Sequence, residues 1–267
     1  MDKYTSYCSG TIHYSDTGEG NVIVLLHGYL ESSDVWRDII PELARFSRVI
    51  TMDLPGAGES DVFGSEHTME FMADAVRSLM DELAIEKVMI VGHSLGGYVA
   101  LAFLELFPDR LRCYCLFHSH PMADTDEVIA NRKREIKIVE SGKKDIIYPV
   151  NIPKMFADCN LEKFETELEY MKEVASRIPA EGIIALIKGM ISRPSRLDLL
   201  EKGEVPLLYI LGRMDNYIPY ELFNIIIRMP KNAELVTFEN SGHLGFIEEK
   251  EKTVNVLREF FENNFHN

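Results

Sequence analysis

The strongest constraint on the fold of this chain is a regular alternation between short apolar runs and helix-length amphipathic segments. The apolar runs lie at 21–26, 48–52, 87–91, 111–117, 205–211 and 234–238. The amphipathic segments include 68–83, 95–107 and 220–229. Apolar runs without polar alternation are typical of parallel strands that helices cover on both faces. The alternation therefore predicts an α/β fold built from strand–helix–strand crossovers.

This rhythm breaks between residues 118 and 204, where charged helical patterns replace the strands. One apolar stripe at helical spacing comprises Leu161, Phe164, Leu168, Met171, Ala175 and Ile178. A shorter apolar helix is expected at 182–190. We therefore predict a catalytic core of residues 1–120 and 204–267, interrupted at 121–203 by a helical cap, or lid, that roofs the carboxyl edge of the sheet.

Composition narrows the class of partner and the setting. The chain has 267 residues, 46% of them hydrophobic, which is enough for one large core with an insertion. Its formal net charge of −15 repels polyanions, so nucleic acid is not an expected partner. We find no apolar stretch long enough for a signal peptide or a bilayer span, and expect a cytoplasmic protein.

The four cysteines, Cys8, Cys113, Cys115 and Cys159, show neither metal-ligand spacing nor a disulfide framework. Cys113 and Cys115 alternate within an apolar run, so we expect them to be small core residues on one face of a strand. No metal site is predicted.

The clearest chemical motif is a Gly-x-Ser-x-Gly sequence, which runs from Gly92 to Gly96 with Ser94 at its centre. It follows the run at 87–91 and precedes the helical segment at 95–107. A sharp strand-to-helix turn exposes such a serine hydroxyl, and the glycines allow neighbouring backbone to pass closely. The alternative is a serine that only caps the helix. The flanking strand and helix favour Ser94 as a nucleophile.

A serine nucleophile requires a base to accept its proton. Of the eight histidines, His243 is best placed, because it follows the run at 234–238 in a glycine-containing loop. The base in turn needs an acid that fixes its tautomer. Asp215 follows the run at 205–211, and although it could be a turn former, the order serine, acid, histidine favours catalysis.

Other histidines have structural interpretations. Surface or hydrogen-bonded positions are expected for His13, His67 and His266, and loop-holding positions for His27 and His93. His118 and His120 follow the run at 111–117 and should lie at the rim of the site. Structural hydrogen bonding is favoured for both, with contact to substrate or lid as the alternative.

An oxyanion formed by attack on a carbonyl needs preorganised donors. Two backbone amides are available, that of Leu95 after the nucleophile and that of Tyr29 after the run at 21–26. Only backbone is required, which leaves the Tyr29 side chain free to line an acyl pocket.

Several motifs together resemble the α/β-hydrolase fold family over nearly the whole chain except 121–203. They are His27-Gly28-Tyr29, Asp53-Leu54-Pro55-Gly56-Ala57-Gly58-Glu59-Ser60, Gly92-His93-Ser94-Leu95-Gly96-Gly97, Asp215 and Gly242-His243. The resemblance implies a mostly parallel eight-stranded sheet flanked by helices, a helical cap after the sixth strand, and hydrolysis through an acyl-enzyme without a cofactor. It also implies a Ser94–Asp215–His243 triad, with Tyr29 and Leu95 as the oxyanion hole.

Some members of this family place the acid after the sixth strand, where this chain has Asp124, but the intact Asp215 loop favours Asp215. The chain departs from many members at Ala57, where they carry histidine, and this turn mainly shapes the floor of the site. The insert also has a basic stretch at 127–145, usually a solvated helix face. We hypothesise that Arg132 or Arg134 reaches inward to hold a substrate carboxylate.

We therefore predict a serine hydrolase that cleaves a carboxylic ester or similar acyl bond of a small molecule. Two alternatives remain, a carbon–carbon bond hydrolase or lyase on the same fold and a receptor-like binder with little turnover. The family branches that attack with aspartate are excluded, because position 94 is serine.

Overall fold

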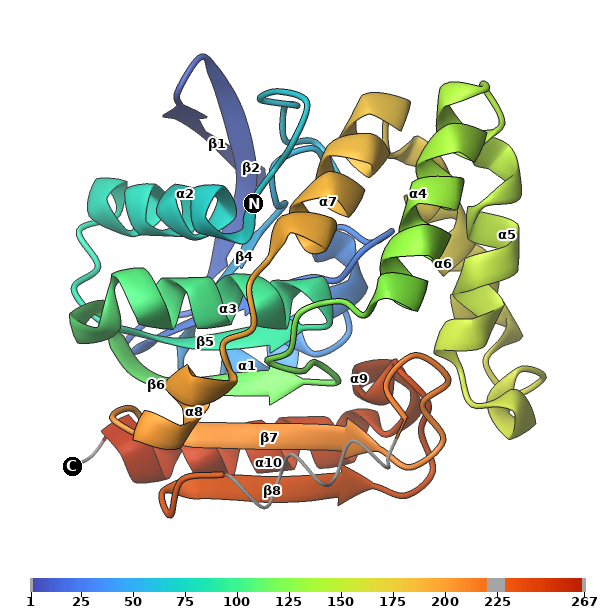
Figure 1. The fold of residues 1–267 in the computed structure, drawn as a ribbon. Helices are drawn as coiled ribbons and strands as arrows, with labels where there is room; N and C mark the ends of the chain where they lie inside the picture. The colour runs from blue at the N-terminus through green and yellow to red at the C-terminus, as the bar shows by residue number, and fades with distance from the viewer. Residues whose placement is uncertain (1, 220–228, 266–267) are drawn as a thin grey trace.

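A computed structural model describes residues 2–219 and 229–265, and an eight-stranded sheet forms its centre (Figure 1). The strands are β1 (Asp2–Tyr7), β2 (Gly10–Thr17), β3 (Val22–Leu26), β4 (Arg48–Met52), β5 (Val88–His93), β6 (Leu111–Phe117), β7 (Leu207–Gly212) and β8 (Ala233–Phe238). Their order across the sheet is β1-β2-β4-β3-β5-β6-β7-β8. Every pairing from β4 to β8 is parallel, and β2 is antiparallel to both neighbours. The predicted mostly parallel eight-stranded sheet is confirmed.

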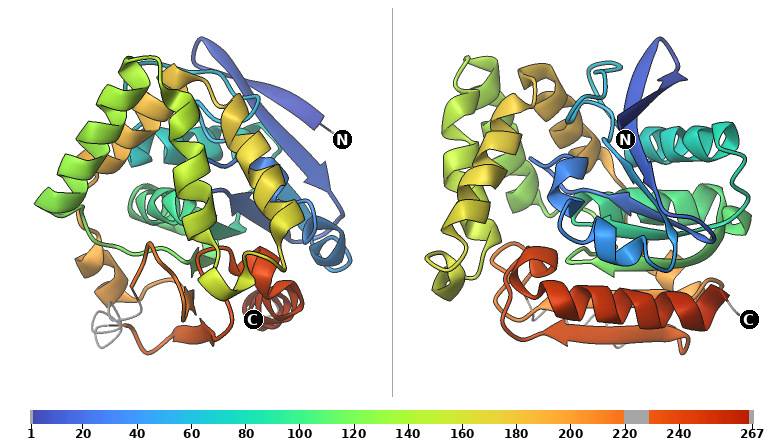
Figure 2. Two further views of the ribbon diagram at one scale, coloured as in Figure 1. Left: turned by 90° about the vertical axis from the view of Figure 1, so that its right-hand side faces the viewer. Right: turned by 180° about the vertical axis from the view of Figure 1, so that it is seen from behind.

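Helices cover both faces of the sheet (Figures 1 and 2). The helices outside the insert are α1 (Ile40–Leu43), α2 (Met69–Glu82), α3 (Leu95–Leu106), α9 (Gly245–Glu248) and α10 (Lys250–Phe265). Of these, α2 and α3 lie on one face, and α1 and α10 on the other. The helix expected at 220–229 falls almost entirely outside the described residues.

All six apolar runs are strands, but β1 and β2 were not recognised from their residues. They form a hairpin at the edge of the sheet, and β1 has only two buried residues among polar ones, with Tyr4 54% exposed. An edge strand needs no continuous apolar run, because one side of its ladder and much of its surface face solvent.

The insert between β6 and β7 is helical throughout its regular structure. Its helices are α4 (Asp126–Glu140), α5 (Tyr148–Asn151), α6 (Glu165–Arg177), α7 (Ala180–Ser192) and α8 (Leu197–Lys202). Helices α4 to α7 lie beyond the carboxyl ends of the parallel strands (Figures 1 and 2). The predicted apolar stripe packs inward, with Met171, Ala175 and Ile178 buried.

Two further expectations concern the core and the membrane. Cys113 and Cys115 are fully buried in β6 as free thiols. Within residues 2–219 and 229–265, no helix has the length and apolar character needed to cross a bilayer.

Candidate active site

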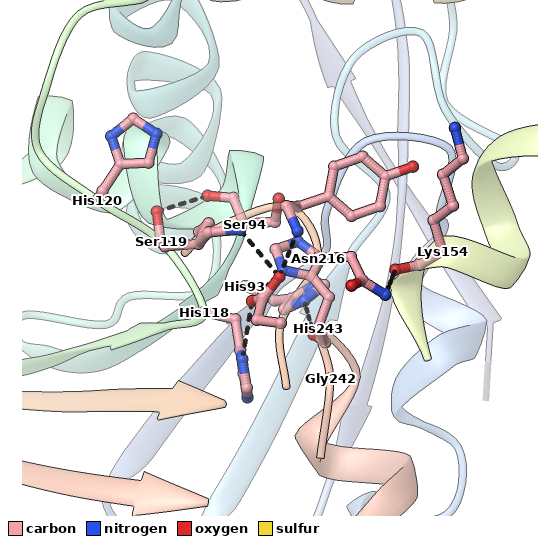
Figure 3. Close-up of polar contacts among 12 residues, drawn as sticks. His93, Ser94, His118, Ser119, His120, Lys154, Asn216, Gly242 and His243 are labelled. Carbon is pink, nitrogen blue, oxygen red and sulfur yellow. Dashed lines mark hydrogen bonds and ion pairs between the residues drawn. The ribbon is translucent and has the colours of Figure 1, made fainter. Parts of the chain in front are cut away.

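The carboxyl edge of the sheet brings the three predicted triad residues into one region, because Ser94, Asp215 and His243 each follow a parallel strand. The ring of His93, next to Ser94 in the chain, lies with Nε2 2.8 Å from the carbonyl oxygen of His243. Figure 3 shows His93, Ser94, His118 and His243 gathered at this edge.

Ser94 occupies a strained turn between β5 and α3. Its φ of 49° and ψ of −114° lie in a region that non-glycine residues rarely adopt. A Cβ at Gly92 would lie 2.3 Å from the carbonyl oxygen of Gly96, and one at Gly96 would lie 2.3 Å from that of Leu26. Both glycines are therefore required by close backbone approach.

The hydroxyl of Ser94 does not cap the helix that it precedes. Although Ser94 is the N-cap residue of α3, its side chain makes no capping hydrogen bond. Its backbone is held instead, because its N–H donates to Phe117 O and its carbonyl oxygen accepts from Ser119 Oγ. The helix-cap interpretation of the motif is therefore wrong, and the side chain is half-buried at the sheet edge.

Asp215 and His243 form a buried hydrogen-bonded pair. His243 Nδ1 lies 2.7 Å from Asp215 Oδ2, and Asp215 Oδ1 accepts from the backbone N–H groups of Tyr217 and Ile218 at 2.7 and 2.9 Å. The pair thus joins the loop after β7 to the loop after β8. Its geometry places the Nδ1 proton of His243 toward Asp215 and leaves Nε2 as the unprotonated nitrogen.

Burial and charge act in opposite directions on this pair. Burial alone would raise the pKa of Asp215, but the charge of His243 and hydrogen bonds from both histidines hold that pKa well below its ordinary value. Burial lowers the pKa of His243, while the charge of Asp215, their hydrogen bond and the charges of Glu31 and Glu248 together raise it by more. His243 therefore accepts a proton more readily than a free histidine, and Asp215 stays ionised.

A second histidine contacts the same carboxylate. His118 is fully buried rather than at the rim, and its Nδ1 lies 3.3 Å from Asp215 Oδ2. His120 is engaged elsewhere, since Tyr98 Oη lies 3.0 Å from its Nε2 and its Nδ1 accepts from the N–H of Met122. Both histidines thus make structural hydrogen bonds, and neither contacts the insert helices through these bonds.

The trio of His118, Asp215 and His243 is also the one set of donor atoms in the described residues close enough to share a metal ion, all within 4.8 Å. Zinc needs about 2 Å to each nitrogen or oxygen ligand. Here both Nδ1 atoms already lie at hydrogen-bond distance from one oxygen, so an ion would have to separate the pair. The donor set fits a proton network and does not fit a metal site.

The two predicted oxyanion donors lie on either side of the turn. Leu95 is the first residue of α3 and Tyr29 follows β3, and within the described residues neither backbone N–H has an acceptor. The N–H of Gly28 is not available, because it donates to Glu31 Oε2. Contrary to expectation, the Tyr29 side chain is not free, since its hydroxyl donates to Glu135 Oε1 on α4 at 2.6 Å.

The basic residues of the insert do not form an open anion site. Arg134 is exposed and donates to Asn131, so it does not reach inward. Arg132 is turned inward but lies 2.7 Å from Asp124, whose other oxygen contacts Arg193 at 2.8 Å. Asp124 thus pairs with two arginines, and it is Asp215 that lies against His243.

Sequence reasoning missed Glu248, which anchors the histidine loop. Its buried carboxylate accepts hydrogen bonds from the backbone of Gly242 and Ala157 and from the side chain of Asn160, each at 2.8 Å. The N–H of His243 also donates to Met155 O. Because Glu248 is one acid in a chain of 43 acidic residues, no local pattern distinguished it.

His27 and His93 hold loops, as expected. His27 Nε2 accepts from the N–H of Leu54, which ties the end of β3 to the end of β4. His93 Nδ1 lies 3.0 Å from buried Glu31 while its Nε2 contacts the His243 carbonyl. Two loops around the site are thereby fixed relative to the sheet.

Known proteins share this architecture. A family model described as alpha/beta hydrolase fold matches residues 21–137. A thermophilic esterase from Thermogutta terrifontis, solved with malate bound, is 30% identical, with a TM-score of 0.92 over 98% of each chain. The AB hydrolase superfamily protein YisY of Bacillus subtilis is 29% identical over 94% of this chain and 95% of its own.

A third relative is named for a specific substrate. The 2-hydroxy-6-oxononadienedioate/2-hydroxy-6-oxononatrienedioate hydrolase of Paraburkholderia phymatum is 26% identical over 97% of this chain and 94% of its own. Sheet order, strand-to-helix turn and full-length similarity agree, and the chain belongs to the α/β-hydrolase fold family.

Proposed function

We propose that this protein is a serine hydrolase that cleaves a carboxylic ester or similar acyl bond of a small molecule. The observation that carries the proposal is the 2.7 Å bond between His243 and Asp215 beside a strained turn whose serine hydroxyl makes no helix cap. Ser94 is the proposed nucleophile, His243 the general base and Asp215 the acid that orients it.

The proposed reaction follows from this geometry. Nε2 of His243 removes the proton of Ser94 Oγ as Oγ bonds to the carbonyl carbon, and the N–H groups of Tyr29 and Leu95 stabilise the oxyanion. His243 then protonates the leaving alkoxide, which leaves an acyl group on Ser94. Water, deprotonated by His243, releases the acid and regenerates the serine.

We further propose that residues 121–203 form a cap over a core of residues 1–120 and 204–267. Two hydrogen bonds that join the insert to the site support this division. Glu135 of α4 accepts from the side chain of Tyr29, and Met155 accepts from the backbone of His243. Such a cap would exclude water from the acyl-transfer step.

A carbon–carbon bond hydrolase is the second candidate. The relative from Paraburkholderia phymatum is named for a 2-hydroxy-6-oxo dienedioate, a compound without an ester bond, so its hydrolysis must break a carbon–carbon bond. The esterase from Thermogutta terrifontis has the higher identity, 30% against 26%, and we therefore place ester hydrolysis first.

A fluorophosphonate probe followed by intact-mass measurement tests the shared chemistry, because only an activated serine reacts quickly. We expect one adduct on the wild type and none on Ser94→Ala or His243→Ala. Ser141→Ala, which alters an exposed serine, should still be labelled. Absence of an adduct on folded wild type would overturn the proposal and favour a binder.

Turnover then separates the two hydrolases. We expect steady hydrolysis of p-nitrophenyl acetate and butyrate that Ser94→Ala abolishes. Negligible ester turnover together with cleavage of a vinylogous diketone would replace the first candidate by the second.

A further inference from the structure

Two histidine side chains lie within hydrogen-bond distance of one oxygen atom of the proposed triad acid. Asp215 Oδ2 lies 2.7 Å from His243 Nδ1 and 3.3 Å from His118 Nδ1. The side chains of His118, Asp215 and His243 are 0%, 1% and 3% exposed. The mechanism proposed above uses only one of these two histidines, and the second is unexplained.

The fold specifies the position of the His118 ring. His118 follows β6 with a φ of 46°, in the left-handed region that is costly for a non-glycine residue, and its N–H donates to Ile210 O at 2.9 Å. A Cβ at Gly212 would lie 2.6 Å from its Cε1, and one at Gly245 would lie 2.6 Å from its Nε2. Two glycines therefore make room for this imidazole.

The surroundings also determine the tautomer of His118. Its Nε2 is buried and has no hydrogen-bond partner among the described residues, whereas its Nδ1 faces an ionised carboxylate. A proton on Nε2 would be an unsatisfied buried donor, which is energetically unfavourable. His118 is therefore neutral, with its one proton on Nδ1 directed at Asp215.

Several charged and titratable groups surround this pair. His118 faces Asp215, His243 and His93, and His243 additionally faces Glu31, Glu248 and the ring of Tyr217. Burial lowers the pKa of His118 to about 4, although the hydrogen bond to Asp215 and the charge of that carboxylate act in the opposite direction. His118 thus acts as a neutral donor throughout the range in which His243 can work as a base.

We propose that His118 is a positioning residue that shares the Asp215 oxygen with His243, fixing the carboxylate and moderating the basicity of His243. This inference rests on the proposed function. A hydrogen bond to the charged form of a carboxylate stabilises that charge and leaves less of it to stabilise an imidazolium. Without the His118 donor, His243 should become more basic and the carboxylate less well oriented.

A donor-removing and a donor-retaining variant test this proposal. His118→Leu removes the donor and keeps an apolar side chain of moderate size, whereas the amide nitrogen of His118→Asn can replace Nδ1. We expect the acid limb of kcat/KM to move up by about 0.5 pH unit or more in His118→Leu, with kcat reduced about tenfold. His118→Asn should retain the wild-type profile.

The pKa of His243, followed by NMR of ¹⁵N-labelled histidine side chains without substrate, provides a readout independent of turnover. We expect it to rise in His118→Leu and not in His118→Asn. An unchanged His243 titration in His118→Leu, or equal shifts in both variants, would overturn the proposal. If His118→Leu does not fold, His118→Ala removes the donor without adding bulk.

The two proposals can fail separately. A shifted His243 titration in a protein that the fluorophosphonate probe does not label would refute the serine-hydrolase function while supporting the His118–Asp215–His243 coupling. Labelling of Ser94 with an unshifted titration would do the reverse.

Discussion

The two sides of the candidate site are built in opposite ways. On the side of the proposed nucleophile, Ser94 is half-buried, with a strained backbone and a side chain that caps nothing, and the amides of Tyr29 and Leu95 have no acceptor among the described residues. On the acid–histidine side, Asp215 and His243 are buried, and both carboxylate oxygens of Asp215 and Nδ1 of His243 are hydrogen-bonded.

This difference separates the groups that would react with a substrate from the groups that must be held in one orientation. Unpaired groups and strain remain where a substrate would supply the missing partners, whereas the groups that must hold one orientation are over-determined by hydrogen bonds. The acid–histidine side even recruits the insert, through Met155 and Asn160. Activity and stability should therefore respond differently to mutation on the two sides.

Substitution of Ser94, the proposed nucleophile, should give the largest difference between the effect on activity and the effect on stability. Ser94→Gly should reduce kcat by about 10⁴-fold or more. It should also raise the free energy of unfolding by about 1 kcal/mol, because glycine relieves the strained φ. Esterase assays and urea unfolding measure the two effects.

Ser94→Ala is the matched control, because it removes the hydroxyl and retains the strain. It should lose as much activity without becoming more stable. A clear loss of stability in Ser94→Gly would contradict the view that the turn is strained for reactivity.

On the acid–histidine side, Asp215→Asn should lower both activity and stability. We expect kcat to fall about 10⁴-fold because His243 loses its orienting charge. The free energy of unfolding should fall by about 1–3 kcal/mol, since an amide nitrogen would face backbone or imidazole donors. Exposed Asp158, mutated to Asn, should leave both near wild type. Full stability in Asp215→Asn would remove the contrast between the two sides.

Glu248→Gln tests the carboxylate that anchors the His243 loop without contacting the proposed triad side chains. One of the three hydrogen bonds that Glu248 accepts would meet an amide NH₂ group, so we expect about 1–3 kcal/mol less stability. The loosened His243 loop should lower kcat about tenfold. Exposed Glu251→Gln on α10 is the control. Unchanged kinetics would show that the loop keeps its place without this carboxylate.

Tyr29→Phe should have the smallest effect. It removes the hydrogen bond to Glu135, worth about 0.5–1.5 kcal/mol, and keeps the backbone N–H proposed for the oxyanion. We expect kcat for p-nitrophenyl acetate to change by no more than about threefold. A hundredfold loss would mean that the hydroxyl takes part in the reaction.

Much of the fold followed from local patterns. The six apolar runs became strands β3 to β8, and Gly92 and Gly96 identified a turn that only they permit. Strand β1 was not predicted because an edge strand needs no continuous apolar run, and β2, although paired on both sides, was not predicted because its residues are largely polar. The hypothesis that Arg132 or Arg134 holds a substrate carboxylate is not supported, because Arg132 pairs with Asp124 and the helix turns Arg134 to solvent.

By itself, the sequence determined the parallel core, the sharp turn at Ser94 and the order of serine, acid and histidine. Burial of strands and helices produces a local hydrophobic pattern in the sequence, and the tight turn requires glycines at local positions. Only the tertiary structure decided that Asp215 and not Asp124 contacts His243, that His118 shares its oxygen and that Glu248 holds the loop. These contacts join loops as far as 97 residues apart in the chain. Tertiary packing determines such pairs, and the periodicity of the sequence carries no information about them.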